Sequence, residues 1–553
     1  MISRRAFAGG ALGLALGSQL AAPALAQGAP NFAPAVAAIR AYAEAHLRTF
    51  GLPGMTLGLT APGGFEQILD FGVADRDTRA AVTPDTLFQI GSISKVMTAL
   101  VIHQLAAAGR LSLTDQVSRL VPAVPLPPGS GISVQHLLDH VSGLPGNAPM
   151  FPERGLSQGS RPGAHWHYSN TGYTILGEIA EVAAGKPLSQ LIEAQILLPL
   201  GMRRSRGAIV AADRLAYAQG YTAADDTIPH AHGAPLAPAA WVDVTFGAGS
   251  VASTAAEMLR FIRALSDLAG GRGGLGLSPA QGLAFVRHAV RSDSPLMSYG
   301  NGLMHVGGSG RAYLHHTGGM VGFSSAFHLD RASGAGAFAS ANVGFGLEYR
   351  PRLLTAFAVD ALTNAMRGVV LPTPKLLTVP LTPAATTSLL GRYSGSAGAF
   401  EIRPGAQLTI VADGHSAPLQ HWGNDLFRTS HPAYRRFVLM IDRKAGKVNS
   451  AAWGPETFIR DGSGAVAARS DPALARLAGR YTNDSPWWGT SIVVERGGRL
   501  WIGTDTALHP IGDNLWRVGD EAWSPERLSF ADFIGGQPQT MILSGVKFER
   551  HDI

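Results

Sequence analysis

Two short stretches of the chain place a serine and a lysine three residues apart, a spacing that can support nucleophilic catalysis. They are Ser92-Ile93-Ser94-Lys95 and Ser544-Gly545-Val546-Lys547. A serine hydroxyl is a weak nucleophile at neutral pH and needs a neighbouring base to accept its proton. On a helix, residues three apart share a face, so a lysine amine can lie beside the serine hydroxyl. On a strand, residues three apart point to opposite faces and cannot meet.

The elements expected around the two copies separate them. Apolar residues follow Ser92 at helical spacing as far as Gly109, which predicts a helix over about 92–108. A serine in the first turn of that helix also offers its own backbone N–H to a developing oxyanion. The second copy lies in "TMILSGVKFER", an alternating, strand-like run. The spacing therefore lets Ser92 and Lys95 meet and keeps Ser544 and Lys547 apart. On its own it also fits a purely structural role, with Ser92 as an N-cap and Lys95 as a solvated helix residue.

Two further stretches add polar groups suited to the same chemistry. Tyr168-Ser169-Asn170 stands just before a predicted helix at 171–184, and His316-Thr317-Gly318-Gly319 lies on a predicted strand. Lysine or tyrosine can act as the base when cationic neighbours lower its pKa, and the sequence leaves open whether Lys95 or Tyr168 does so. The paired glycines lack a Cβ, which lets a substrate backbone lie against the strand.

In the order S-x-x-K, Y-x-N and (K/H)-T-G, these boxes resemble the serine β-lactamase and penicillin-binding protein superfamily, particularly its class C-like branch. "LLDHVSGLPG" at 137–146 and "GAGSVASTAAEMLRF" at 247–261 are also similar to that branch, so the resemblance spans about 35–365. It implies an acyl-enzyme mechanism. No metal or cofactor is expected, because the H-E-x-x-H motif is absent and the histidine pairs His165/His167 and His230/His232 have no carboxylate cluster nearby. The implied catalytic residues and roles are the Ser92 nucleophile, a Lys95–Tyr168 proton-transfer pair, Asn170 bonded to Lys95 or to a substrate amide, and an oxyanion hole from the N–H groups of Ser92 and Gly319.

His316 departs from the family pattern, because many members have lysine there. Histidine is largely neutral near pH 7 and is less suited to holding a substrate carboxylate. Members with histidine include D-aminopeptidases, one group of which has two β-barrels after the catalytic domain. The resemblance thus implies amides of D-amino acids or short cell-wall-type peptides as substrates. A free substrate ammonium needs a carboxylate partner, and the candidates are Asp484, Asp505 and Asp513 of the second β module.

Other functions stay open at this point. One alternative is a carboxylesterase or weak β-lactamase of the same fold, and another is a non-catalytic cell-wall-binding protein. Two competing motifs lack their context: Gly155-Leu156-Ser157-Gln158-Gly159 has no strand before it and no helix after it, and the glycine-rich 271–276 follows a helix rather than a strand. Both are predicted to be loops.

The expected catalytic domain covers 30–367 and is α+β, an antiparallel sheet flanked by helices. A helix is predicted at 33–49, followed by the strand-like "GMTLGLTA" and "FEQILDFGVA", and further strands are predicted late in the domain, in "GRAYLHHTG" and "FSSAFHLDRASGAGAFASANVG". Helices between an early strand pair and a late strand group indicate one sheet that unites both ends of the domain.

Beyond 367 the texture of the sequence changes. Residues 368–386 form a proline-rich linker, predicted to be extended. Short alternating runs then repeat with an offset of about 90 residues: "LLGRY" recurs as "LAGRY", "GNDLFR" as "GDNLWR", and "FIR" as "FER". The repeat predicts two related antiparallel modules, 387–462 and 472–553, each long enough for a small closed barrel.

Composition limits the compartment and the partners. Residues 1–26 have an Arg pair, an apolar run and a final Ala-Leu-Ala, the pattern of a removable signal peptide of the twin-arginine type. We therefore expect a periplasmic or secreted protein without a membrane span after signal removal. The chain has no cysteine, and its net charge of +6 comes from scattered arginines, so no nucleic-acid partner is expected. The expected partner is a small peptide, amide or ester substrate.

Overall fold

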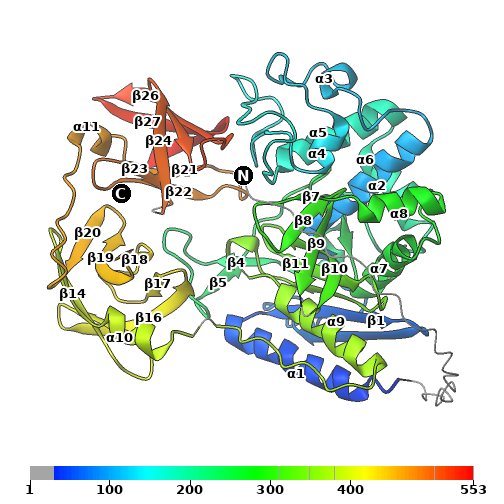
Figure 1. The fold of residues 1–553 in the computed structure, drawn as a ribbon, viewed down its shortest axis with the longest axis horizontal. Helices are drawn as coiled ribbons and strands as arrows, with labels where there is room; N and C mark the ends of the chain where they lie inside the picture. The colour runs from blue at the N-terminus through cyan, green and yellow to red at the C-terminus, as the bar shows by residue number, and fades with distance from the viewer. Residues whose placement is uncertain (1–29, 309, 348, 379, 504, 552–553) are drawn as a thin grey trace, which may run out of the picture.

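The computed structural model describes residues 30–551 except 309, 348, 379 and 504. The predicted signal peptide, 1–26, lies outside the described residues. The chain forms a large α/β body and two smaller β bodies, which lie side by side along one flank of the large one (Figure 1).

One antiparallel sheet forms the centre of the large body. Its strand order is β2-β1-β12-β11-β10-β9-β8-β7, so β1 near the start of the domain pairs with β12 near its end. The prediction that one sheet unites the two ends is confirmed. The strands are β1 Gly54–Ala61, β2 Phe65–Gly72, β7 Val290–Arg291, β8 Met297–Gly300, β9 Leu303–Gly308, β10 Arg311–Gly319, β11 Ser324–Asp330 and β12 Gly336–Ala341.

Helices cover both faces of this sheet. Helices α1 and α9 pack together on one face and bury a core against β1 and β12 (Figure 1). The other face carries the larger core, built from α2, α5, α7 and α8. The helices are α1 Ala33–Phe50, α2 Ser94–Ala107, α3 Val117–Leu120, α4 Val134–Leu138, α5 Asn170–Ala184, α6 Leu188–Ile192, α7 Ala255–Ala269, α8 Pro279–Arg287 and α9 Arg352–Met366.

Helix α2 differs from its predicted form in two ways. A 3-10 turn, Gly91–Ile93, precedes it, so Ser92 lies in that turn and the α-helix begins at Ser94. Every residue from Ser94 to Ile102 is also buried, rather than only one stripe of them. The helix therefore runs through the interior of the domain, which holds its first turn firmly.

The two β bodies are closed antiparallel barrels of eight strands each, as the repeat predicts. Barrel 1 comprises β13 Gly391–Gly395, β14 Gly398–Arg403, β15 Thr409–Ala412, β16 His415–Gly423, β17 Leu426–Thr429, β18 Leu439–Lys444, β19 Lys447–Trp453 and β20 Glu456–Arg460. Barrel 2 comprises β21 Gly479–Thr482, β22 Thr490–Glu495, β23 Leu500–Ile502, β24 Thr506–Gly512, β25 Leu515–Val518, β26 Arg527–Ile534, β27 Gln537–Leu543 and β28 Val546–His551.

A short helix precedes each barrel: α10 Pro383–Leu389 and α11 Pro472–Ala475. The last part of the predicted extended linker is thus helical. Proline stands in the first turn of both helices, where its fixed φ and missing N–H are tolerated. No described helix is both long and apolar enough to cross a membrane.

Candidate active site

Ser92 and Lys95 lie together, as their spacing predicts. The Lys95 Nζ is 2.9 Å from the Ser92 Oγ, 2.6 Å from the Asn170 Oδ1 and 2.8 Å from the carbonyl oxygen of Ala248. Asn170 is the first residue of α5, and Ala248 belongs to the segment 247–261. Three separate parts of the chain therefore meet at one amine.

The surroundings of Lys95 favour its neutral form. Its side chain has no solvent exposure, and this burial holds the pKa of the amine well below the usual lysine value. The rings of Tyr168 and Tyr173 lie 5.0 and 5.5 Å from the nitrogen. A neutral amine can donate its two N–H groups to Asn170 and Ala248, which leaves its lone pair for the proton of Ser92.

Tyr168 faces the same serine. Burial raises the pKa of its phenol, although a hydrogen bond with Ser92 and the positive charge of Arg350 lower it in part. The net shift of the pKa is upward, so the phenol stays protonated at neutral pH and has a proton to donate. Beside it, Asn170 donates a hydrogen bond from Nδ2 to the Oδ1 of Asn147 at 2.7 Å.

His316 lies close to this group, with its ring centroid 6.3 Å from that of Tyr168. Its ring has no solvent exposure, its Nε2 is 3.2 Å from the Tyr299 hydroxyl, and its Nδ1 is 2.6 Å from the carbonyl oxygen of Thr317. Burial is the main reason that the pKa of His316 falls to about 3. Neither His316 nor Lys95 is among the described residues that line the cleft, so the role expected of His316 at the site stays a prediction.

The glycines of β10 are required by close packing against the turn that carries Ser92. A Cβ added to Gly318 would lie 1.8 Å from the carbonyl oxygen of Ile90. Gly91 has φ +54°, and a Cβ there would lie 2.7 Å from the backbone nitrogen of Gly319. The backbone of Gly319 therefore lies against the Ser92 turn, where the two N–H groups of the expected oxyanion hole would have to be.

These groups open into a cleft of about 830 Å³. Its wall combines the catalytic domain with barrel 2, which contributes Trp487, Trp488 and Val546. The cleft also contains Arg350, whose Nη2 would lie 3.0 Å from a Cβ built on Gly319. Arg350 was not predicted from the sequence. In the sequence, the one local feature that points to Arg350 is its position after the last strand of the sheet. For Trp487 and Trp488 it is that they stand next to each other in a turn-like run.

The described residues that line the cleft include no aspartate or glutamate. Asp484, Asp505 and Asp513 are thus not placed to hold a substrate ammonium, and that expectation is wrong for the described cleft. From barrel 2 the described lining contains Trp487, Trp488 and Val546 instead.

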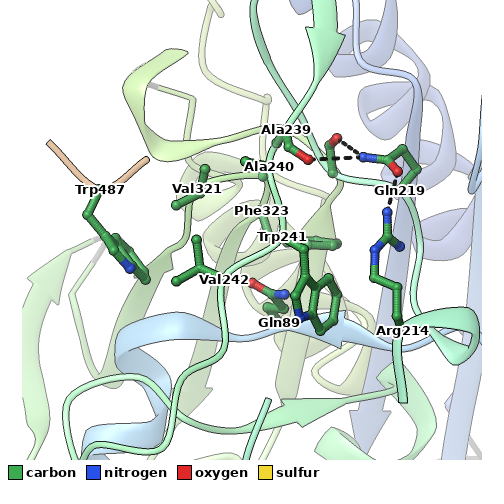
Figure 2. A pocket seen from close by; sticks show the side chains of 12 residues that line it. Gln89, Arg214, Gln219, Ala239, Ala240, Trp241, Val242, Val321, Phe323 and Trp487 are labelled. Carbon is green, nitrogen blue, oxygen red and sulfur yellow. Dashed lines mark hydrogen bonds between the residues drawn. The ribbon is translucent and has the colours of Figure 1, made fainter. Parts of the chain in front are cut away.

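A second, much smaller hollow of about 10 Å³ adjoins the cleft and shares Trp487 with it (Figure 2). Trp241, Val242, Val321 and Phe323 line it, and Gln219 bonds across one side to Arg214 and to the carbonyl oxygens of Gly220 and Ala239. This volume is about that of one water probe. The hollow therefore has room for about one water molecule.

The two competing serines lie elsewhere. Ser157 Oγ donates to the carbonyl oxygen of Pro525 at 2.9 Å, and Ser544 Oγ donates to Glu526. Lys547, the lysine of the second S-x-x-K copy, bonds Glu153 at 2.6 Å rather than Ser544. Both motifs lie at the contact between the catalytic domain and barrel 2, and their hydrogen bonds are part of that contact rather than of a catalytic site.

Comparisons with known proteins agree with this arrangement. Residues 39–359 match the family model Beta-lactamase. Penicillin-binding protein 4* of Bacillus subtilis (strain 168) is 34% identical over 155 residues, which cover 25% of this chain and only 34% of that protein. The octameric penicillin-binding protein homologue from Pyrococcus abyssi, with 22% identity and a TM-score of 0.55, shares the fold over 77% of this chain and 100% of its own.

A third comparison concerns D-amino acid amidase from Ochrobactrum anthropi SV3, in the structure of its complex with L-phenylalanine. It is 26% identical, has a TM-score of 0.50, and covers 60% of this chain and 99% of that one. Since the family model spans more than half of the chain and the fold agrees, the chain belongs to the β-lactamase family, within the superfamily of serine β-lactamases and penicillin-binding proteins.

Proposed function

We propose that this protein is an exported serine hydrolase that forms an acyl-enzyme at Ser92 and hydrolyses amide bonds of small peptides or amides containing D-amino acids. The observation that carries the proposal is the buried Lys95 amine, held 2.9 Å from the Ser92 hydroxyl by two fixed acceptors at the edge of an 830 Å³ cleft. These contacts argue against a non-catalytic cell-wall-binding protein, because a binding role has no need for a desolvated amine.

In the acylation step, Ser92 Oγ attacks the substrate carbonyl carbon and its proton passes to the neutral Lys95 Nζ. The carbonyl oxygen gains negative charge and is stabilised by the backbone N–H groups of Ser92 and Gly319. The C–N bond then breaks, and the leaving nitrogen takes a proton from the Tyr168 phenol, which Lys95 reprotonates. This order assigns Lys95 as the base and Tyr168 as the acid, in keeping with the opposite shifts of their pKa values.

Deacylation repeats the sequence with water. Water attacks the acyl carbon and gives its proton to the same pair, and the Ser92 Oγ leaves with a proton from Lys95. The product acid and the free hydroxyl of Ser92 complete the balance.

The lining of the cleft narrows the substrate class. Trp487 and Trp488 offer flat apolar surfaces, and the guanidinium of Arg350 lies beside Gly319. With a cation and without a described carboxylate in the lining, the cleft favours a substrate with a carboxylate over one with a free ammonium. Within the proposed class this supports a D,D-peptidase type over a D-aminopeptidase type, and the D-amino acid amidase similarity supports an amide substrate.

The test is a comparison of kcat/KM for four matched substrates on the mature protein: a D-aminoacyl amide, its N-acetylated form, an acyl-D-Ala-D-Ala peptide, and that peptide with an amidated C-terminus. We expect the peptide with the free carboxylate to be preferred over its amidated form. No preference for the free carboxylate, together with a strong preference for the free amine, would reverse the assignment within the family.

A carboxylesterase is the second candidate, favoured by the absence of acidic groups among the described residues of the cleft and by its apolar wall. An ester of the same acyl group separates the two. An ester turned over readily while every amide is inert supports the esterase.

A further inference from the structure

A loop of barrel 2, between β25 and β26, brings a carboxylate into the catalytic domain. Glu526 Oε1 accepts a hydrogen bond from the backbone N–H of Gly146 at 2.6 Å and lies 3.0 Å from the His167 Nε2. Its Oε2 accepts from the hydroxyl of Ser544. The side chain is only 22% exposed, so these partners largely replace water around it.

This carboxylate is ionised at neutral pH. Burial raises the pKa of Glu526, but hydrogen bonds from His167, Gly146 and Ser544 outweigh it and hold the pKa below the usual glutamate value. Hydrogen bonds to an ionised acceptor are stronger than neutral ones. Glu526 therefore binds Gly146 and His167 together more firmly than an uncharged side chain would.

Two of the three partners of Glu526, Gly146 and His167, belong to the segments that hold the site. The carbonyl oxygen of Gly146 accepts from the backbone N–H of Asn170 at 2.7 Å, and His167 is directly followed by Tyr168. The backbone N–H of His167 also donates to the carbonyl oxygen of His140 at 2.8 Å. Glu526 thus holds His167, the residue before Tyr168, directly, and it holds Asn170 through Gly146. It is not itself among the described residues that line the cleft.

We propose that Glu526 is a positioning residue through which barrel 2 holds Tyr168 and Asn170 against Lys95, so that barrel 2 is a working part of the active site rather than an attached module. The proposal rests on the proposed function, since it concerns the same site. It also explains why Glu526, which is 380 positions from Gly146 in the sequence, reaches the backbone that bonds Asn170 and not only the surface of the catalytic domain.

Two other contacts of the same interface provide matched controls. Ser157 Oγ donates to the carbonyl oxygen of Pro525, and Lys547 pairs with Glu153 in an exposed salt bridge. Neither reaches the 165–170 segment. We expect that removing either contact weakens docking of the barrel without releasing Tyr168.

The experiment uses the full mature protein and the variants Glu526→Ala, Glu526→Gln, Ser157→Ala and Lys547→Ala, with kcat, KM and Tm measured for each. Displacing a catalytic group by about 1 Å can cost about 100-fold. We therefore expect Glu526→Ala to lower kcat about 10- to 100-fold with KM changed less than about threefold. Glu526→Gln should recover most of the loss, because an amide oxygen still accepts from Gly146, and the two controls should keep kcat.

A folded Glu526→Ala with kcat within about twofold of the parent overturns the proposal, and so does an equal loss of kcat in both controls. Where Glu526→Ala does not fold, Glu526→Asp, which keeps the charge but shortens the reach, takes its place with the same expected loss in kcat. Labelling of Ser92 by a fluorophosphonate in the parent protein distinguishes a failure of the proposed function from a failure of the role proposed for Glu526. No labelling in the parent contradicts the proposed function, whereas normal labelling with unaffected variants contradicts only the role of Glu526.

Discussion

At the scale of single residues, the nucleophilic serine differs from the two competing serines in the groups that surround it. Ser92 has an amine 2.9 Å away, whereas Ser157 and Ser544 bond to a backbone carbonyl and a carboxylate at the barrel 2 contact. We predict that Ser92→Ala abolishes covalent labelling by a fluorophosphonate, while Ser157→Ala and Ser544→Ala retain it. Intact-mass spectrometry of the three variants measures this directly. Labelled Ser92→Ala protein would mean that the nucleophile lies elsewhere.

Lys95 and Tyr168 form one proton path, because each contacts Ser92. General acid–base assistance is worth about 10² to 10⁴ in rate, so Lys95→Ala and Tyr168→Phe should each lower kcat by about that factor. Groups that act as a unit are not additive. The double variant should therefore be little worse than either single variant, and a loss equal to the product of the two would show separate roles.

The protonation state of Lys95 gives this path a pH dependence. The amine takes the proton of Ser92 only when neutral, and burial lowers its pKa. Activity should accordingly rise as pH rises through that lowered pKa, well below the usual lysine value. The rising limb of kcat/KM against pH locates it in the parent protein, and a Tyr168→Phe variant should keep that limb, since lysine and not the phenol titrates there. Loss of the limb with the phenol would transfer the base role to Tyr168.

At the scale of elements, the site depends on how closely β10 approaches the turn at 91–93. Gly318 and Gly91 lie where any side chain would meet backbone atoms, and backbone cannot move aside as a flexible side chain can.

We predict that Gly318→Ala lowers Tm and reduces activity at least about 10-fold, because its Cβ would lie 1.8 Å from the carbonyl oxygen of Ile90. Gly307→Ala, on the neighbouring strand β9, is the matched control, since nothing lies within 4 Å of a Cβ there. Thermal unfolding and kcat/KM of both variants test this. Equal behaviour of the two would contradict the packing argument.

Each barrel is held to the segment before it by two hydrogen bonds that recur in the repeat. Tyr393 and Tyr481 occupy equivalent places in the repeat, and each donates its hydroxyl to the leucine carbonyl four residues earlier, at 2.8 and 2.7 Å. Arg460 and Arg550 likewise donate to equivalent carbonyl oxygens, of Leu390 and Ala478. The repeated sequence thus marks the residues that close each barrel onto its preceding segment.

At the scale of the whole molecule, buried neutral histidines couple stability to pH. Burial lowers the pKa of His46, His305 and His315 to about 4 and that of His316 to about 3, and it lowers those of His140 and His328 well below the usual value. An unfolded chain binds protons at these positions near pH 6.5, whereas the folded chain does not. The stability that these neutral rings contribute is therefore fully present above about pH 6.5 and is lost as pH falls below it.

We predict that Tm decreases steeply between about pH 6.5 and pH 4. His315→Gln should reduce the slope, because it removes one of the groups that must bind a proton on unfolding. Calorimetric Tm values across this range provide the measurement. A flat profile down to pH 4 would show that these rings are protonated in the folded protein.

Much of this molecule is specified by local sequence. Ser92 and Lys95 share a helical face because of their spacing, and the structure brings them and Asn170 to one point. The alternation of polar and apolar residues and the offset of about 90 residues predict two closed β bodies, which the structure contains. Patterns of this kind depend on periods of two and 3.6 residues along the chain, so they can be read without knowing what packs against them.

The tertiary structure alone decides the features that join distant segments. Arg350, Trp487 and Trp488 meet Ser92 in one cleft although up to 396 positions separate them, and Glu526 reaches Gly146 across 380. His316 shows the same limit, because its place on a strand gives no sign that its ring is fully buried. Charge, burial and pKa are set by all neighbours in space at once, and the order of residues along the chain specifies only the near ones.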